Sequence, residues 1–381
     1  MARAGQTTRA GRFELFDTPW WSIALPIIGV IMLIITWGRD LDLLLVVLGG
    51  LALIGSVVTA VHHAEVIAHR VGDPFGSLIL AVAVTVIEVG LIVTLMISGG
   101  EKAASLPRDT VFSAVMITCN LIIGLCLLVG PAKHWTVRFS AQGSTAALAV
   151  VATLVTLTMV LPTFTTSAPG GTFTGLQLGF AGAASILLYG VFVFVQTVRH
   201  RDFFIPLEVL KVADSPDETR GEHDHAPPPS NRATLFSLGL LLVCLVAVVG
   251  LAKSESPALE GGLTAVGAPP GVVGVAIALI VLAPETTAAV RAALRNRLQT
   301  SLNLALGSAM ASIGLTIPVI ALASIWLPTP LILGLRGADI VLLGLTVVIS
   351  ILTLTQHRAT VLQGVLHLSV FASYLFIAFN P

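Results

Sequence analysis

Residues 76–95 read GSLILAVAVTVIEVGLIVTL, an apolar run whose one charged side chain, Glu88, lies near its middle. A helix of about 20 mostly apolar residues is long enough to cross the hydrocarbon core of a membrane. The sequence predicts about eleven such spans, at residues 20–38, 41–61, 76–98, 110–130, 144–163, 174–198, 234–251, 271–290, 301–324, 331–355 and 361–379. The expected fold class is therefore an all-α polytopic membrane protein.

The composition of the chain supports this fold class. Of its 381 residues, 55% are hydrophobic and 10% are charged, whereas soluble domains carry about 25% charged residues. A soluble enzyme, a disordered protein and a coiled coil are excluded. The 20 Lys and Arg residues are balanced by 20 Asp and Glu residues, so no basic field for nucleic acid exists.

Positive charges predict the orientation of the chain. With a cytoplasmic N-terminus, fifteen Lys and Arg residues fall in inner segments and four in outer segments, and Arg336 falls in the tenth span. Cytoplasmic loops are enriched in Lys and Arg. We therefore expect a multi-pass protein of a prokaryotic cytoplasmic (inner) membrane, with the N-terminus inside and the C-terminus outside.

The chain divides into two halves around one hydrophilic stretch. Residues 1–40 form an N-terminal segment with a leading helix, 41–198 a first set of five helices, 199–233 a cytoplasmic linker, and 234–381 a second set of five. Because five is odd, equivalent helices run in opposite directions, as in the inverted repeats of secondary transporters. The acidic, histidine-containing linker is interpreted as a solvated connection, with a metal-sensing role as the weaker alternative.

Two glutamates occupy matched positions in these repeats. Glu88 is central in the second helix of the first set, and Glu285 follows Pro284 in the second helix of the second set. Proline removes a backbone donor and kinks a helix. An intramembrane carboxylate costs several kcal/mol unless it is protonated, paired or hydrated. Neutral helix-packing glutamates are the alternative, but packing gives no reason to repeat a costly group.

Two facing carboxylates suit one chemical task. Without a metal they hold protons, because desolvation and mutual repulsion disfavour their charged forms. With a divalent cation bound, both ionise, and Ca²⁺ accepts 6–8 oxygen ligands in flexible geometry. Competition between cation and protons for Glu88 and Glu285 would couple the two movements. Zinc and copper are less suitable, since no thiolate or histidine is near either glutamate in sequence.

Other polar residues inside the spans are candidate supporting ligands or site-lining residues. Ser308 and Ser312 continue to Thr316 along one helical stripe, which is equally typical of a small-residue packing seam. The supporting candidates are Thr85, Asn120, Asn303, Ser308 and Ser312.

Two further polar groups lie near predicted span ends. His62, Glu65 and His69 have helical spacing where the second span meets the cytoplasm, which allows a gate, a proton relay or simply a wet helix end. Arg336 and Asp339 are three residues apart, which allows an ion pair.

Two stretches resemble the signatures of bacterial calcium/proton antiporters of the calcium/cation antiporter superfamily. The first runs from His69-Arg-Val-Gly72 through Ser77 to Glu88, and the second from Pro284-Glu285 through residues 295–308. The resemblance implies export of Ca²⁺ against inward-moving H⁺ with no resident cofactor. It matches Glu88 and Glu285 to the family's paired cation-binding glutamates, Asn120 to its asparagine, and Ser308 to the serine of its Gly-Ser pair.

The chain also departs from the wider superfamily. Val84-Thr85 and Val281-Leu282 stand where the superfamily has Gly-Asn, and Thr286 stands where vacuolar exchangers have histidine. Loss of amide ligands keeps Na⁺ or K⁺ exchange for H⁺ as the alternative. An intramembrane enzyme is disfavoured because no catalytic motif is present. A channel is disfavoured because lone carboxylates do not form filter rings.

Overall fold

The computed structural model describes residues 19–71, 75–204, 229–265, 267, 269, 271–326 and 330–381. Most of the predicted linker, residues 205–228, lies outside the described residues, and so does its alternative metal-sensing role. The chain forms two compact units. Unit 1 comprises Met1–Leu80 and His225–Ser254, and unit 2 comprises Ala81–Asp224 and Glu255–Pro381.

Unit 1 is built from α1 (Trp21–Thr36), α2 (Leu43–Val71) and the first part of α10 (Asn231–Ala265). Glycine allows these helices to approach closely. A Cβ at Gly29 of α1 would lie 2.3 Å from the Ser56 hydroxyl and 3.2 Å from the Cβ of Ala247. Small residues at such contacts are the usual way in which membrane helices pack.

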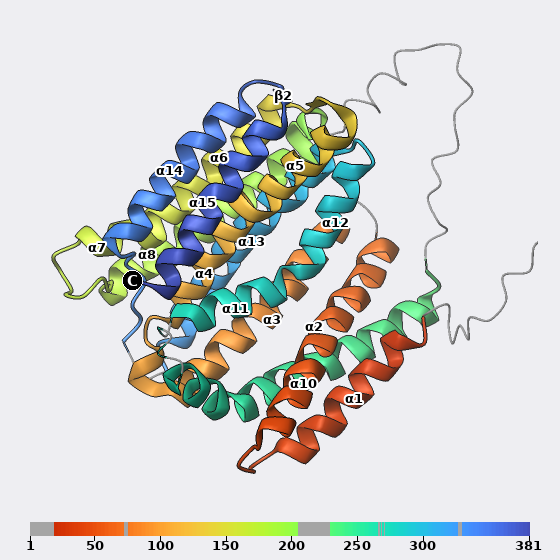
Figure 1. The fold of residues 1–381 in the computed structure, drawn as a ribbon, viewed down its shortest axis with the longest axis vertical. Helices are drawn as coiled ribbons and strands as arrows, with labels where there is room; N and C mark the ends of the chain where they lie inside the picture. The colour runs from red at the N-terminus through yellow and green to blue at the C-terminus, as the bar shows by residue number, and fades with distance from the viewer. Residues whose placement is uncertain are drawn as a thin grey trace, which may run out of the picture. The chain divides into compact units, whose positions relative to one another are not determined.

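Unit 2 holds the remaining helices, which run alongside one another as a bundle (Figure 1). The most enclosed spans are α4–η2–α5, 83% buried in its most apolar window, and α13, 61% buried. These two spans form the core of the unit. In chain order the elements are α3 (Phe75–Gly99), whose first residues belong to unit 1, η1 (Gly100–Ala103), α4 (Leu106–Met116), η2 (Ile117–Ile122), α5 (Ile123–His134), β1 (Val137–Arg138), α6 (Ala141–Val155), η3 (Thr156–Val160), α7 (Leu161–Phe164), α8 (Gly175–Phe194), η4 (Val195–Arg199), η5 (Arg201–Phe203), α11 (Gly271–Val281), α12 (Ala283–Leu294), α13 (Leu298–Ala323), α14 (Gly337–Leu354), β2 (Arg358–Ala359) and α15 (Val361–Phe379).

The helices of the described residues confirm the predicted fold class. Nine are long and apolar enough to span a membrane, and the pair α11–α12 makes a tenth, bent by 52°. The shorter apolar helix α1 corresponds to the predicted leading span. The bend lies at Leu282, two residues before Pro284, for which the sequence predicted a kink because proline cannot donate the hydrogen bond that continues the helix.

One predicted boundary is wrong. The tenth span was expected from residue 331, but α14 begins at Gly337, so Arg336 is its N-cap and not part of its first turn. The preceding backbone is held by other loops instead. The N–H groups of Ile332 and Gly334 donate to the carbonyls of Ala104 and Gly171 at 3.2 and 2.8 Å. These tertiary hydrogen bonds replace the helical ones that the apolar sequence favours.

Two backbone contacts join the two halves at equivalent positions. Strand β1 follows the third span of the first half and pairs antiparallel with β2, which precedes the fifth span of the second half. An antiparallel bridge joins Thr172, before the fifth span of the first half, to Ile332, after the third span of the second half. Each contact becomes the other when the halves are interchanged.

The fifth helices of the two halves also start in the same way. Thr174 and Gln177 form a capping box on α8, and Thr360 and Gln363 form one on α15. In such a box the threonine hydroxyl and the glutamine side chain satisfy two backbone N–H groups that have no partner inside the helix. Matched caps on matched helices agree with the inverted repeat that the odd helix number predicts.

Candidate cation site

Glu88 lies in the middle of the unbroken helix α3 and is 4% exposed. Ser312 of α13 lies with its hydroxyl oxygen 2.7 Å from both carboxylate oxygens of Glu88. Thr316, one turn further along α13, donates a hydroxyl hydrogen bond to Oε2 at 3.2 Å. A carboxyl group from the first half is therefore bound by two hydroxyl groups from the second half.

Helix α13 presents different residues to Glu88 and to helix α8. Ser312 and Thr316 face Glu88, whereas Gly314 between them faces α8, where an added Cβ would lie 2.8 Å from the Cβ of Tyr189. Ser308 lies one turn before Ser312 and is half-buried. Among the described residues, the hydrogen bonds to Glu88 come from Ser312 and Thr316. Helix α13 thus contacts Glu88 through Ser312 and Thr316 and packs against α8 through Gly314, while a cation-ligand role for Ser308 and Ser312 stays a prediction.

Glu285 has a different setting at the break between α11 and α12. It is 7% exposed and lies in the first turn of α12, directly after Pro284. The N-terminus of a helix carries a partial positive charge, which stabilises a carboxylate there. Because Pro284 has no N–H, the carbonyl of Ile280 four residues earlier loses its helical donor. Broken helices of this kind carry the ion sites of many transporters.

Two of the predicted supporting residues use their polar groups elsewhere. Thr85 is 5% exposed, and its hydroxyl donates to the carbonyl of Ala81 in its own helix at 2.8 Å. Asn303 donates to the carbonyl of Phe204 at 2.6 Å and accepts a hydrogen bond from Gln299 at 2.8 Å. Asn303 therefore fastens the start of α13 to the segment after α8.

Asn120 belongs to a second buried cluster rather than to the hydrogen-bond partners of Glu88. It lies in the π-helix η2, and its amide nitrogen donates to Thr346 of α14 at 2.9 Å. Its Oδ1 is 3.3 Å from Nδ1 of His367 on α15, and Nε2 of His367 is 3.3 Å from the hydroxyl of Thr353. Because that oxygen can only accept, Nδ1 carries the proton and Nε2 accepts from Thr353.

This second cluster contains residues that the sequence analysis missed. His367 and Thr346 are 0% and 1% exposed, inside predicted apolar spans. The signal was available, since a lone histidine within a membrane span is costly and therefore worth singling out. The π-helix could not be inferred in this way. Such one-turn widenings of an α-helix occur frequently at functional sites.

The polar end of α2 belongs to unit 1. His62 packs against the ring of Trp21 with centroids 4.9 Å apart, and His69 is exposed. His63, which the sequence analysis passed over, is fully buried with Nε2 2.9 Å from the carbonyl of Ser22. Helix α2 extends through Glu65 and His69 to Val71, beyond the predicted span. A gate or relay role for His62, Glu65 and His69 stays a prediction.

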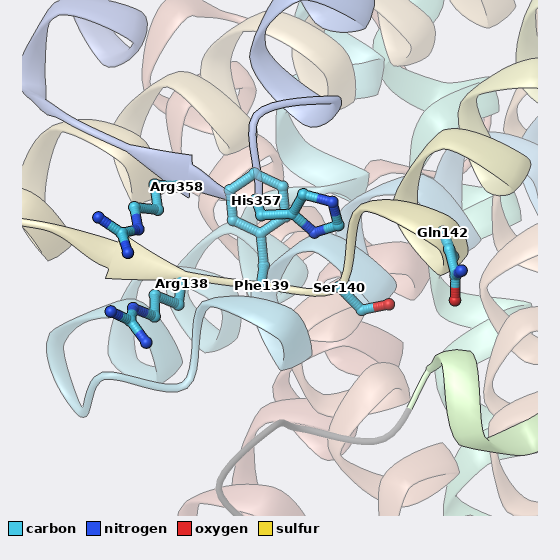
Figure 2. A pocket seen from close by; sticks show the side chains of 6 residues that line it. All are labelled: Arg138, Phe139, Ser140, Gln142, His357 and Arg358. Carbon is cyan, nitrogen blue, oxygen red and sulfur yellow. The ribbon is translucent and has the colours of Figure 1, made fainter.

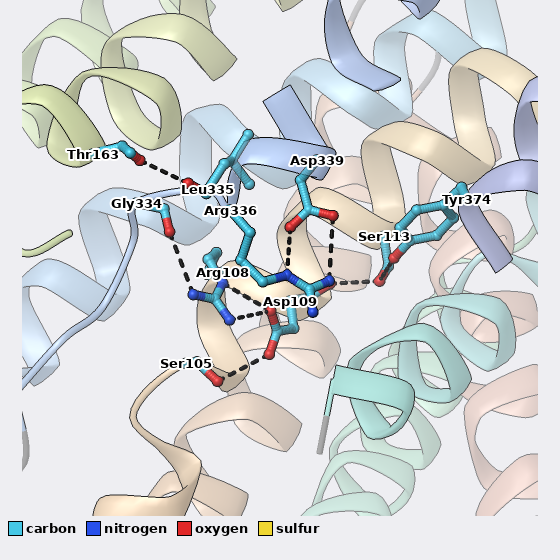
Figure 3. Close-up of polar contacts among 10 residues, drawn as sticks. All are labelled: Ser105, Arg108, Asp109, Ser113, Thr163, Gly334, Leu335, Arg336, Asp339 and Tyr374. Carbon is cyan, nitrogen blue, oxygen red and sulfur yellow. Dashed lines mark hydrogen bonds and ion pairs between the residues drawn. The ribbon is translucent and has the colours of Figure 1, made fainter. Parts of the chain in front are cut away.

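A charged cluster fastens one end of unit 2 (Figure 3). The predicted pair of Arg336 and Asp339 is confirmed, with Nε to Oδ2 at 2.8 Å, and Arg108 pairs with Asp109 at 2.8 Å. Arg108 also donates to the carbonyl of Gly334 at 3.4 Å. The hydrogen bond to Asp339 raises the pKa of Arg336 above its usual range. Both arginines at this end are thus neutralised by aspartates.

Comparisons with known proteins agree with this architecture. The chain is 45% identical over 371 residues to the y4hA protein of Sinorhizobium fredii, covering 95% of this chain and 97% of that one. It is 33% identical over 362 residues to the sodium-potassium/proton antiporter ChaA of Escherichia coli, covering 94% and 96%.

Solved structures share the fold at low identity. Native YfkE aligns with a TM-score of 0.68 at 16% identity, over 95% of this chain and 99% of that one. The H⁺/Ca²⁺ exchanger CAX aligns with a TM-score of 0.66 at 14% identity, over 93% and 86%. A model of the sodium/calcium exchanger protein family matches residues 41–198 and 236–380. This multi-pass chain therefore belongs to the sodium/calcium exchanger protein family, within the calcium/cation antiporter superfamily.

Proposed function

We propose that this chain exchanges Ca²⁺ for H⁺ by alternating access, with the cation and the protons competing for Glu88 and Glu285. The observation that carries the proposal is the burial of two carboxyl groups, 4% and 7% exposed, in matched helices of the two halves. A buried carboxylate needs a counter-charge or a proton, because desolvation of the bare ion is costly. The two neutralised states exclude each other, which couples cation movement to proton movement.

The oxygen atoms around these glutamates suit a hard cation. Ca²⁺ accepts 6–8 oxygen ligands from carboxylates, carbonyls and water. Ser312 and Thr316 already lie at Glu88, and Pro284 frees the Ile280 carbonyl close in sequence to Glu285. When the cation leaves, the same hydroxyl groups can turn to hydrogen-bond the carboxyl group, as they do at Glu88.

The division of the chain into two units supports a transport cycle in which one group of helices moves. The resemblance to calcium/proton antiporters implies that the first helix of each repeat slides across the rest, and those helices are α2 and α10. Helix α2 and the first part of α10 cluster with α1 in unit 1, whereas both glutamates belong to unit 2. In the proposed cycle the outward-facing site releases Ca²⁺ and takes up protons, and the inward-facing site does the reverse, with the N-terminus in the cytoplasm.

A monovalent-cation/H⁺ antiporter is the second candidate. One specific observation favours it, since the relative that is 33% identical is a sodium-potassium/proton antiporter. Thr85 and Leu282 stand where the superfamily has asparagine before each glutamate, which agrees with a site of fewer amide ligands. Both candidates use Glu88 and Glu285 in the same way.

Countertransport in proteoliposomes separates the two candidates. The purified full-length chain is reconstituted with a pH-sensitive dye inside, and Ca²⁺, Na⁺ or K⁺ is added outside across a range of pH. Saturable proton release driven by Ca²⁺ supports the first candidate, and release driven only by Na⁺ or K⁺ supports the second. If no cation drives proton movement in vesicles that contain inserted protein, antiport itself is wrong.

A further inference from the structure

A basic pocket opens beside the β1–β2 pair of unit 2 (Figure 2). Its volume is about 420 Å³, and it is lined by Arg138, Phe139, Ser140, Gln142, His357 and Arg358. No acidic side chain is among these lining residues. Residues from two distant loops, one before α6 and one before α15, are therefore brought together around one opening.

The strand pairing forces two positive charges together. In the β1–β2 register Arg138 lies directly opposite Arg358. Figure 2 shows both guanidinium groups extending to the same side of the ladder. Like charges directly opposite on paired strands destabilise the pairing. A geometry that holds two arginines in this position favours an anion between or beside them.

Neither arginine is neutralised by the protein in the described part of the chain. The ion pairs there join Arg108 to Asp109 and Arg336 to Asp339. Those two pairs lie at the opposite end of the bundle, where each guanidinium has its own carboxylate. The contrast between the two ends shows that the charge of Arg138 and Arg358 is left available to a ligand.

The two arginines suit one class of anion, because the planar guanidinium group matches phosphate oxygens in pairs. The start of α6 lines the same pocket through Ser140 and Gln142, but Figure 2 shows the two guanidinium groups extending away from these residues. The backbone N–H of Ser140 already donates to the side chain of Gln299 at 2.7 Å. The guanidinium groups of Arg138 and Arg358 are therefore the donors that the pocket offers to an anion.

Residues near the pocket are typical of a membrane interface. Trp135, at the end of α5 just before β1, is 90% exposed, as expected of a tryptophan at a membrane interface. Exposed basic side chains at this same end, on α12 and the turn after it, include Arg291, Arg295 and Arg297. An excess of arginine marks the cytoplasmic face, whose lipids are partly anionic.

We propose that this pocket binds a phosphate group, with Arg138 and Arg358 as its guanidinium ligands. The phosphate belongs either to the headgroup of an anionic phospholipid or to a free phosphate ion. Neither cation exchange nor the glutamate site requires such a ligand. Binding here would join the loop before α6 to the loop before α15, and so would fasten the two halves of unit 2 at this end.

Ligand-dependent thermal unfolding of the full-length chain in a neutral detergent tests the proposal. The probes are phosphatidylglycerol, zwitterionic phosphatidylcholine and inorganic phosphate, each titrated against the wild type. The double substitution Arg138→Gln and Arg358→Gln is compared with Arg291→Gln and Arg295→Gln, which removes the same charge from the same end outside the pocket. A third variant, Arg138→Lys and Arg358→Lys, keeps the positive charge but lacks the planar guanidinium group that makes two parallel hydrogen bonds. It also checks that the pocket loops still fold.

Phosphatidylglycerol is expected to raise the unfolding midpoint of the wild type and of the α12 variant. The glutamine pair in the pocket should weaken the apparent affinity by roughly tenfold or more, the loss expected for a bidentate contact. The apparent affinity of the lysine variant should lie between those of the wild type and the glutamine variant. A comparable effect of inorganic phosphate alone identifies the free ion as the ligand. The proposal is overturned if the glutamine variant of the pocket binds phosphatidylglycerol and inorganic phosphate as the wild type does, or if the α12 variant loses as much affinity.

Discussion

The two glutamates occupy equivalent places in the sequence but have different environments. Glu88 lies in an unbroken helix and takes its hydrogen bonds from the side chains of Ser312 and Thr316. Glu285 lies at the start of a half-helix, where the backbone itself supplies positive potential. Inverted repeats therefore fix where two acids stand, whereas each acid can be stabilised by a different part of the chain.

The helices opposite the two glutamates explain the difference. Span α4–η2–α5 is the counterpart of α13, and Gly124 and Gly314 each admit a neighbouring helix, α15 and α8 respectively. When these glycines are aligned, Ile122 and Cys126 take the positions of Ser312 and Thr316. The first half thus lacks the hydroxyl pair of the second. Its buried amide, Asn120, hydrogen-bonds Thr346 and His367 instead.

The largest expected effect comes from neutralising either glutamate. Glu88→Gln and Glu285→Gln keep the shape of the side chain but remove the group that alternates between proton and cation. Each variant should reduce cation-driven proton movement in proteoliposomes to the background of empty vesicles. The exposed residue Asp202 provides the control Asp202→Asn, which should exchange normally. Normal exchange by either glutamine variant would contradict the shared role of the two acids.

Straightening the break tests what is particular to Glu285. Pro284→Ala restores the missing N–H and lets α11 and α12 approach one continuous helix, as α3 is at Glu88. We expect a fall in exchange rate of roughly tenfold, about 1.4 kcal/mol, with the protein still inserted. Pro318→Ala is the matched control, because Pro318 lies inside the continuous helix α13. Equal effects of the two substitutions would show that the break at Glu285 is incidental.

Removing one hydroxyl group tests what is particular to Glu88. Ser312→Ala deletes a donor to a carboxylate, an interaction worth about 1.5–3 kcal/mol, so cation affinity should weaken by about tenfold or more. Ser308→Ala deletes the same group one turn away on the same helix and should change affinity by less than about twofold. Cation titrations of proton release measure both. If Ser308→Ala has the larger effect, Ser308 rather than Ser312 serves the site, as the resemblance to calcium/proton antiporters implied.

The smallest expected effect concerns Asn120, the amide of the counterpart helix. Asn120→Leu removes its hydrogen bonds to Thr346 and His367 and should lower the free energy of unfolding by about 1–3 kcal/mol, because buried polar partners are left behind. Cation affinity should stay within about twofold of the wild type. Adding His367→Leu should recover part of the stability, since both polar partners are then replaced. A large loss of cation affinity with intact stability would instead place Asn120 at the site.

Single-sequence reasoning captured the features that depend on local chemistry. The spans follow from runs of apolar residues, the bend just before Pro284 from the missing N–H of proline, and the pair of Arg336 and Asp339 from helical spacing. The start of α14 could not be found in this way, because the apolar residues before it are held extended by Ala104 and Gly171, far away in the chain. Local helix propensity gives no information about hydrogen-bond acceptors that lie far away in the sequence.

The sequence by itself determined that the chain crosses a membrane many times and that two acidic residues stand within it, because hydropathy and helix length are properties of short segments. Only the tertiary structure decided which partners each polar group has. It assigned the hydroxyl groups of α13 to Glu88, Asn120 to His367, and Arg138 to the side of Arg358. Those pairings join segments that are distant in the sequence. They depend on the packing of the helices, because only that packing brings the two groups within contact distance.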